Sequence, residues 1–306
     1  MARILNSVLI SILAFFGFLG VFALTGLRGS EGGTPGQTTI ARVATQWAGA
    51  STDGSAIQVT LTLANPGSEP VQAIRINHEL VVSGMTFDQA TVPLTQSVPG
   101  GKQGTVTYMA NLDSRFVATW WQAHTQNGES SRLAVRGDLL VREGNLERHL
   151  PFEWTSEWQG RTTDLLSGLA DCPQETQDVC LQSTSAHWDQ GKLQAEIVLR
   201  NAGSFDLQVA GGSVTLAFGP ETVAMATVPR TDLPAQGTAT FEVSLSFDDA
   251  AMSRWWPSHV SSCESSPAQA NLAVQLQEWD GWDAGAMARR SPPATLRTAF
   301  LCEAPA

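Results

Sequence analysis

The chain has 306 residues and is acidic: 29 aspartates and glutamates against 18 lysines and arginines give a net charge of −11. A surface of this sign repels phosphate backbones, so we expect no nucleic-acid partner. Charged residues make up only 15% of the chain, well below the usual quarter, which argues against long surface helices and favours strands with one wet face.

The first predicted element is a transmembrane helix in residues 1–28. Ile4–Leu27 contains no charged residue and is bracketed by two arginines. Such a run can cross the ~30 Å hydrocarbon core as a helix. A cleaved signal peptide is the alternative, because Val21-Phe22-Ala23 resembles a cleavage site. We adopt the uncleaved anchor, since the apolar run exceeds the usual signal core. The glycine-rich residues 29–38 are typical of a flexible linker.

Two later segments, residues 57–63 and 193–199, alternate apolar with polar residues. The first leads into Asn65 and Pro66, and the second into Asn201 and Ala202, with Gly-Ser following in both cases. Period-two alternation predicts half-buried strands, and the Asn-x-Gly-Ser sequences predict turns. The two segments are therefore expected to be equivalent strands of a repeated unit.

A phrase that opens with two tryptophans also occurs twice. WWQAHTQNGESS begins at Trp120 and WWPSHVSSCESS begins at Trp255, an offset of 135 residues. Agreement at several tryptophan and histidine positions is improbable by chance, because both residues are rare. The shared positions include Trp120, Trp121, His124 and Glu129 in the first copy and Trp255, Trp256, His259 and Glu264 in the second. We infer two copies of one domain rather than a single large enzyme.

Each phrase is predicted to begin on a short helix. In the first copy Asp113 is a suitable N-cap, Phe116 shares a helical face with Trp120 and His124, and Gly128 stands where a left-handed C-terminal cap belongs. The tryptophan rings are expected to plug the end of a sandwich, while the histidine and glutamate close the turn with hydrogen bonds.

The second copy departs from this pattern at two positions. Either Asp248 or Asp249 can cap its helix, but Pro257 is expected to shorten or kink it. Cys263 replaces the glycine, so a disulfide could fix the turn by another route.

The four cysteines are expected to form two disulfides. The most economical pairing joins Cys172 to Cys180 and Cys263 to Cys302, although four cysteines allow three connectivities and four reduced thiols are the alternative. An even number behind an export signal favours disulfides, which would place the globular part outside the cytoplasm.

No repeated set of catalytic or metal-binding groups is present. One histidine and one glutamate per copy are too few for zinc or for a two-carboxylate mechanism, and the familiar catalytic motifs are missing. We therefore expect no enzyme activity, no cofactor and no metal. The later tryptophans, Trp154, Trp158, Trp279 and Trp282, suit half-buried packing better than an exposed sugar-binding platform.

The order of these features resembles the water stress and hypersensitive response (WHy) domain of late embryogenesis abundant type 2 proteins, especially membrane-anchored prokaryotic forms. The first copy carries the likeness at Asn65, Pro66, Trp120, Trp121, His124, Gly128 and Glu129, and the second more loosely at Asn201, Trp255, Trp256, His259 and Glu264. The resemblance implies an antiparallel fibronectin-III-like or immunoglobulin-like β-sandwich with one helix. It also implies a non-catalytic role in desiccation, osmotic or other stress.

We therefore expect an all-β chain of two tandem sandwiches behind a transmembrane helix. The expected parts are an anchor (1–28), a linker (29–38), a first domain (39–170), a connection (171–182) and a second domain (183–304). The protein would be a single-pass cell-membrane protein with its globular part extracytoplasmic, acting in stress protection or on an envelope protein, lipid or glycan. The alternative is a surface adhesin or glycan-binding module, which an exposed coplanar row of tryptophans would favour.

Overall fold

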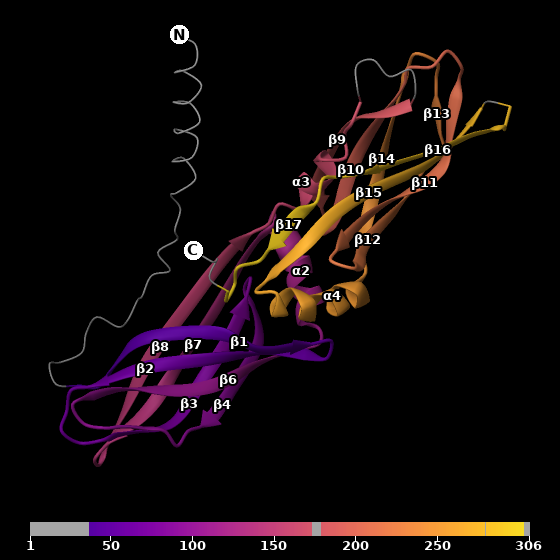
Figure 1. Cartoon of the computed structure of the whole chain (residues 1–306). Helices are drawn as coiled ribbons and strands as arrows, with labels where there is room; N and C mark the ends of the chain where they lie inside the picture. Colours follow the sequence, from indigo (N-terminus) through magenta and orange to yellow (C-terminus); the bar gives the residue numbers. More distant parts are fainter. Residues whose placement is uncertain (1–36, 173–178, 279, 303–306) are drawn as a thin grey trace, which may run out of the picture.

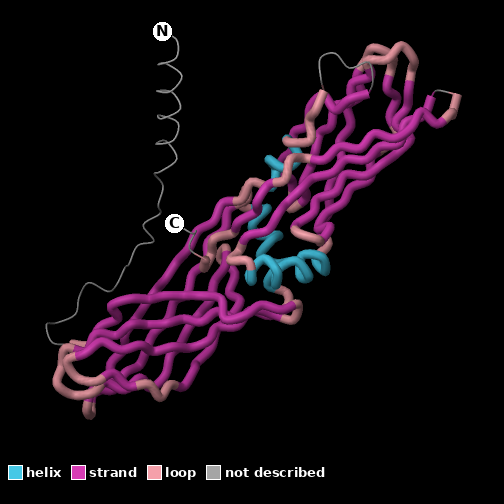
Figure 2. The backbone as a smooth tube through the Cα atoms, viewed as in Figure 1, coloured by secondary structure: helices cyan, strands magenta, loops and turns pink. Residues whose placement is uncertain are grey.

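The computed structural model describes residues 37–172, 179–278 and 280–302, so the predicted transmembrane helix at 1–28 lies outside the described residues. Antiparallel strands dominate, which confirms the all-β class. They form two elongated halves that lie end to end (Figure 1), and the helices gather where the halves meet (Figure 2). No helix in the described ranges has the length and apolar character needed to cross a membrane.

The first half consists of two antiparallel sheets. One has the order β1-β2-β6, formed by β1 (Thr39–Ser51), β2 (Gly54–Asn65) and β6 (Lys102–Asp113). The other has the order β4-β3-β7-β8, formed by β3 (Val71–Val82), β4 (Met85–Pro93), β7 (Ser130–Glu143) and β8 (Leu146–Gln159), with β5 (Ser97–Val98) beside β3. The alternation in β2 has the predicted effect: Ile57, Val59, Leu61 and Leu63 are all fully buried.

The second half repeats this arrangement of strands. The order β9-β10-β14 matches β1-β2-β6, and β12-β11-β15-β16 matches β4-β3-β7-β8. Its strands are β9 (Val179–Asp189), β10 (Lys192–Asn201), β11 (Leu207–Phe218), β12 (Glu221–Val228), β13 (Thr231–Leu233), β14 (Thr238–Phe247), β15 (Ser265–Glu278), β16 (Asp283–Arg290) and β17 (Ala294–Arg297). Here β12 also pairs with β14, which joins the two sheets, and β9 begins inside the segment expected as a connection.

The helices α2 (Phe116–Gln126) and α4 (Asp249–Ser261) occupy equivalent places and pack on each other. The predicted cap of α2 is wrong: Arg115 is its N-cap residue, and Asp113 instead ends β6 and binds the Arg115 backbone N–H and guanidinium. Asp248 does cap α4, accepting from two backbone N–H groups at 2.9 and 3.2 Å. Pro257 does not shorten α4, which has 13 residues against 11 in α2.

Candidate functional site: a duplicated aromatic junction

The first tryptophan of each pair is fixed to its own half by a serine. Trp120 Nε1 donates to Ser131 Oγ at 2.9 Å, and His124 Nδ1 lies 2.9 Å from the same oxygen. In the second half the equivalent bonds join Trp255 Nε1 and His259 Nδ1 to Ser266 Oγ, at 3.0 and 2.9 Å. Each phrase thus folds back so that its helix is tied to the strand that follows.

The second tryptophan of the later pair reaches into the other half. Trp256 Nε1 donates to Ser55 Oγ, at the start of β2, over 3.0 Å. Its ring lies 5.5 Å from those of Trp47 and Phe116 and 5.3 Å from that of Trp120, all residues of the first half. The side chain is fully buried although its backbone belongs to the second half.

Trp121 makes the reciprocal contact. Its ring packs against Trp188, Phe218 and Phe247 of the second half, with ring centroids 6.5, 5.6 and 5.3 Å apart. Trp188 stands on β9 where Trp47 stands on β1, so each early tryptophan receives the second tryptophan of the opposite pair. The two halves therefore meet through a contact with approximate two-fold symmetry.

The turn after each helix is made by two successive residues with positive φ. Gly128 and Glu129 have φ values of 64° and 63°, and Cys263 and Glu264 have 52° and 54°. The glycine is suited to this conformation, whereas the glutamates and the cysteine adopt it against their intrinsic preference. Each glutamate carboxylate then reaches the chain segment that follows the last strand of its half. For Glu129 this is the segment after β8, and for Glu264 it is the segment after β17.

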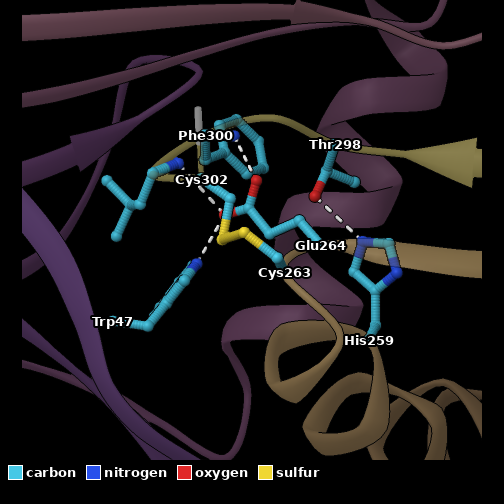
Figure 3. Close-up of a disulfide and its surroundings, with 8 residues drawn as sticks. Trp47, His259, Cys263, Glu264, Thr298, Phe300 and Cys302 are labelled. Atoms are coloured by element: carbon cyan, nitrogen blue, oxygen red, sulfur yellow. Dashed lines mark hydrogen bonds between the residues drawn. A yellow bond between two sulfur atoms is a disulfide. The ribbon is translucent and has the colours of Figure 1, made fainter. Parts of the chain in front are cut away.

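Glu264 holds the C-terminal segment and the first half together (Figure 3). Its carboxylate accepts from Trp47 Nε1 at 2.5 Å, from the Leu301 backbone N–H at 3.1 Å and from the Phe300 backbone N–H. Burial raises the pKa of this carboxyl, while these donors favour its charged form.

Glu129 performs the corresponding task in the first half. Its carboxylate accepts from the Thr162 backbone N–H at 2.6 Å and from Thr163 Oγ1 at 3.2 Å. Both donors belong to the first turn of α3 (Thr162–Ser167), a six-residue helix that the sequence did not predict.

The two histidines differ in the hydrogen bonding of Nε2, the ring nitrogen that does not bind the serine. His259 Nε2 pairs with Thr298 Oγ1 at 2.9 Å, whereas His124 Nε2 has no hydrogen-bond partner among the described residues. Gly160 occupies the place of Thr298, because each donates its backbone N–H to the carbonyl of the motif glutamate. Burial lowers the pKa of both histidines to about 3, so both are neutral at physiological pH.

Two disulfides join the expected cysteine pairs. Cys263 and Cys302 have a Cα separation of 5.5 Å, and their bond fixes the C-terminal segment beside Glu264 (Figure 3). The Cα atoms of Cys172 and Cys180 are 5.1 Å apart, and this second disulfide lies in the connection between the halves. Both distances lie within the ordinary range for disulfides.

The motif asparagines lie far from the junction, so the structure does not bring them to the tryptophans. Asn65 accepts from the Gly67 backbone N–H at 3.1 Å and donates to the carbonyl of Glu69 at 2.8 Å. Asn201 makes the same bonds with Gly203 and Phe205, at 2.9 and 2.8 Å. Each asparagine shapes its turn, and Pro66, which follows Asn65, takes no part in these bonds.

The junction joins the two halves of the chain through buried rings and hydrogen bonds. Its histidines and glutamates are buried and face internal partners. No group of three or more His, Cys, Asp or Glu side chains in the described ranges is placed to hold a metal. Among the described tryptophans only Trp282 is exposed, at 72%, and Trp279 lies outside the described residues.

Several residues of the junction were not singled out from the sequence. Ser131 and Ser266 belong to the repeated Glu-Ser-Ser, so the repeat itself carried a signal for them. Ser55 and Phe300 carry no such signal. Ser55 accepts from Trp256 of the other half, and Phe300 donates its backbone N–H to Glu264, 36 residues earlier in the chain.

Comparison with known proteins leaves the family open. No family model matches the chain, and no match was found among curated proteins. Solved structures with some likeness include a protein from Archaeoglobus fulgidus (17% identical over 40% of this chain and 98% of that one, TM-score 0.37). A protein from Arabidopsis thaliana is 10% identical over 46% and 88% of the two chains, with a TM-score of 0.34. Red sea bream transglutaminase is 11% identical over 84% and 31%, with a TM-score of 0.21. Likenesses this distant carry no argument about function.

Proposed function

We propose that this protein is a membrane-anchored, extracytoplasmic and non-enzymatic protein of the WHy type, with a role in protection from desiccation or osmotic stress or in contact with the cell envelope. The observation that carries the proposal is that the side chains of the repeated motif are buried where the two halves meet. Its tryptophans, histidines and glutamates are buried, and two of its hydrogen bonds, from Trp256 to Ser55 and from Trp47 to Glu264, join the two halves, as expected of structural groups rather than of a reaction centre.

The finer architecture belongs to the same proposal. Residues 39–170 and 183–304 would be two tandem sandwiches of fibronectin-III or immunoglobulin type, joined by residues 171–182. Residues 1–28 would anchor them through the linker 29–38. The repeated strand order supports the first part, and the two disulfides support a location outside the reducing cytoplasm.

The proposal is tested by deleting the gene and returning either the full chain or a secreted form that lacks residues 1–28. After drying or osmotic upshift, the deletion strain should leak periplasmic or cytoplasmic marker enzymes. The full chain should restore the barrier, and the secreted form should restore it poorly, because tethering raises local concentration at the membrane. A deletion strain that survives both stresses like its parent contradicts the proposal.

A surface adhesin or glycan-binding module is the second candidate, and one observation favours it. Phe205 and Trp282 are 75% and 72% exposed. The pairing of Leu207 with Glu278 places their loops at the same end of the β11–β15 ladder. Binding of the full chain to a glycan array, lost in Trp282→Ala but kept in Trp154→Phe, would support this candidate over the first.

A further inference from the structure

A groove of about 490 Å³ lies between the two halves, next to the junction. One wall is the end of β8 together with α3, and the other is the segment 291–297, which contains β17. We propose that this groove binds a small amphipathic anion, a carboxylate carried on an apolar body. The inference goes beyond the proposed function and does not depend on it.

The interior of the groove suits the apolar body of such a ligand. Trp158, Leu165 and Leu296 are buried and line it, and Pro292 and Pro293 complete one side. Its volume falls within the roughly 300–1,000 Å³ of small-molecule sites, which are mostly apolar with a few polar groups that orient the ligand.

The rim supplies the charge. Arg161, just before α3, and Arg297, at the end of β17, stand on opposite walls. Arg297 forms no ion pair with the described residues, and Arg161 has Asp164 at 3.9 Å, also on the rim, as its ion-pair partner. The rim carries two guanidiniums and one carboxylate, a local net charge of +1 in a chain of net charge −11. Guanidinium groups bind carboxylates and phosphates through paired N–H donors, and the singly charged carboxylate matches the local net charge of +1 at this rim.

The floor of the groove is held rigid from behind. Trp158 stacks on His124, with ring centroids 4.0 Å apart and planes inclined by 14°. The unpartnered His124 Nε2 lies against Gly160, where a β-carbon would come within 2.7 Å of it. A glycine is therefore required at this point of the wall, and the tryptophan face is fixed before any ligand arrives.

The test is calorimetric titration of the purified full chain with phenylbutyrate, against the same solution without protein. Phenylbutanol and phenylbutylammonium serve as neutral and cationic analogues of the probe. We expect saturable binding of the carboxylate and roughly tenfold weaker binding of the alcohol, the loss expected for one charge-assisted hydrogen bond. The ammonium analogue should not bind.

Variants assign the binding to the groove. Ala294 is exposed and lines it, so Ala294→Phe should fill the groove and abolish binding while the unfolding midpoint stays near that of the wild type. Arg297→Gln should weaken binding roughly tenfold, and Arg290→Gln, an exposed arginine outside the groove, should leave it unchanged. No saturable binding, equal binding of the three probes, or undiminished binding by a folded Ala294→Phe protein would each overturn the proposal.

Discussion

At the scale of single residues, each copy depends on one buried serine hydroxyl. Ser266 Oγ accepts the Trp255 indole N–H, so its own hydrogen is free to bind His259 Nδ1. The remaining proton of the neutral imidazole then lies on Nε2 and is donated to Thr298 Oγ1. One hydroxyl thus fixes both the orientation of a tryptophan and the tautomer of a histidine.

Replacing this serine should therefore be costly. Ser266→Ala leaves a buried indole N–H and an imidazole nitrogen without a partner, and should lower the free energy of unfolding by about 1–3 kcal/mol. Ser131→Ala should do the same in the first half. Urea unfolding gives the measurement, and Ser130→Ala, the exposed neighbour, is the matched control. Equal effects of Ser130→Ala and Ser131→Ala would contradict this reading.

The buried histidines also predict a dependence on acid. Their folded pKa of about 3 lies below the ordinary 6.5, so the unfolded chain binds more protons between these values. Their contribution is complete above pH 6.5 and is lost as the pH falls, by up to about 1.4 kcal/mol per histidine and pH unit. Glu264 acts in the opposite sense, because its raised pKa makes the folded state take up a proton more readily.

Comparison with a double variant isolates the histidine effect, since Glu264 is common to both proteins. His124→Gln/His259→Gln should lose less stability than the wild type between pH 6.5 and 4, measured as unfolding midpoints in urea. Parallel curves for the two proteins would show that the histidines do not cause the acid sensitivity.

At the scale of elements, α2 and α4 each contribute a ring that belongs to one half and is buried in the other. Trp121→Ala or Trp256→Ala should cost about 3–5 kcal/mol, as for other large core aromatics. Each should also uncouple the halves, so that one calorimetric transition separates into two. Trp282→Ala, at an exposed position, should change stability by less than about 0.5 kcal/mol. A single cooperative transition in all three variants would mean that these rings do not couple the halves.

The two disulfides should differ in how much they stabilise the folded protein. Cys263–Cys302 closes a loop with a sequence separation of 39 and Cys172–Cys180 one of 8. Loop entropy alone predicts about 4 kcal/mol for the first and about 2.5 kcal/mol for the second. Cys302→Ser should therefore lower the unfolding midpoint more than Cys172→Ser, and only Cys302→Ser should expose Phe300 to chymotrypsin. The reverse order would show that the C-terminal segment is held by its other contacts.

At the scale of the whole molecule, the halves form a rod. Strands of 14 residues, as in β7 and β15, span about 45 Å at 3.3 Å per residue, so two halves end to end should measure about 80–90 Å. Small-angle scattering of the chain without residues 1–28 should give this maximum dimension. A compact, near-spherical profile would mean that the halves fold against each other side by side.

Periodicity and repetition made much of this fold predictable. The alternation at 57–63 and 193–199 predicts which side chains are buried, and the duplicated phrase predicts that the two copies have the same arrangement of strands. The junction could not be predicted in the same way, because the partners of Trp121 lie on β9, β11 and β14 of the other copy and no periodic pattern joins them. The predicted N-cap of α2 was wrong for a local reason. The Asp113 carboxylate accepts hydrogen bonds from the backbone N–H and the guanidinium of Arg115 instead of from the first turn of the helix.

The chain enters and leaves this rod at unequal places. Gln37 accepts a hydrogen bond of 2.8 Å from Arg148, which lies just after the β7–β8 turn at the outer end of the first half, whereas Cys302 is bound to Cys263 beside the junction. A pulling force between these two ends would run along the first half and pass through the Cys263–Cys302 bond. The second half would not lie on the path of the force, so its surfaces would keep their shape while the first half is under tension.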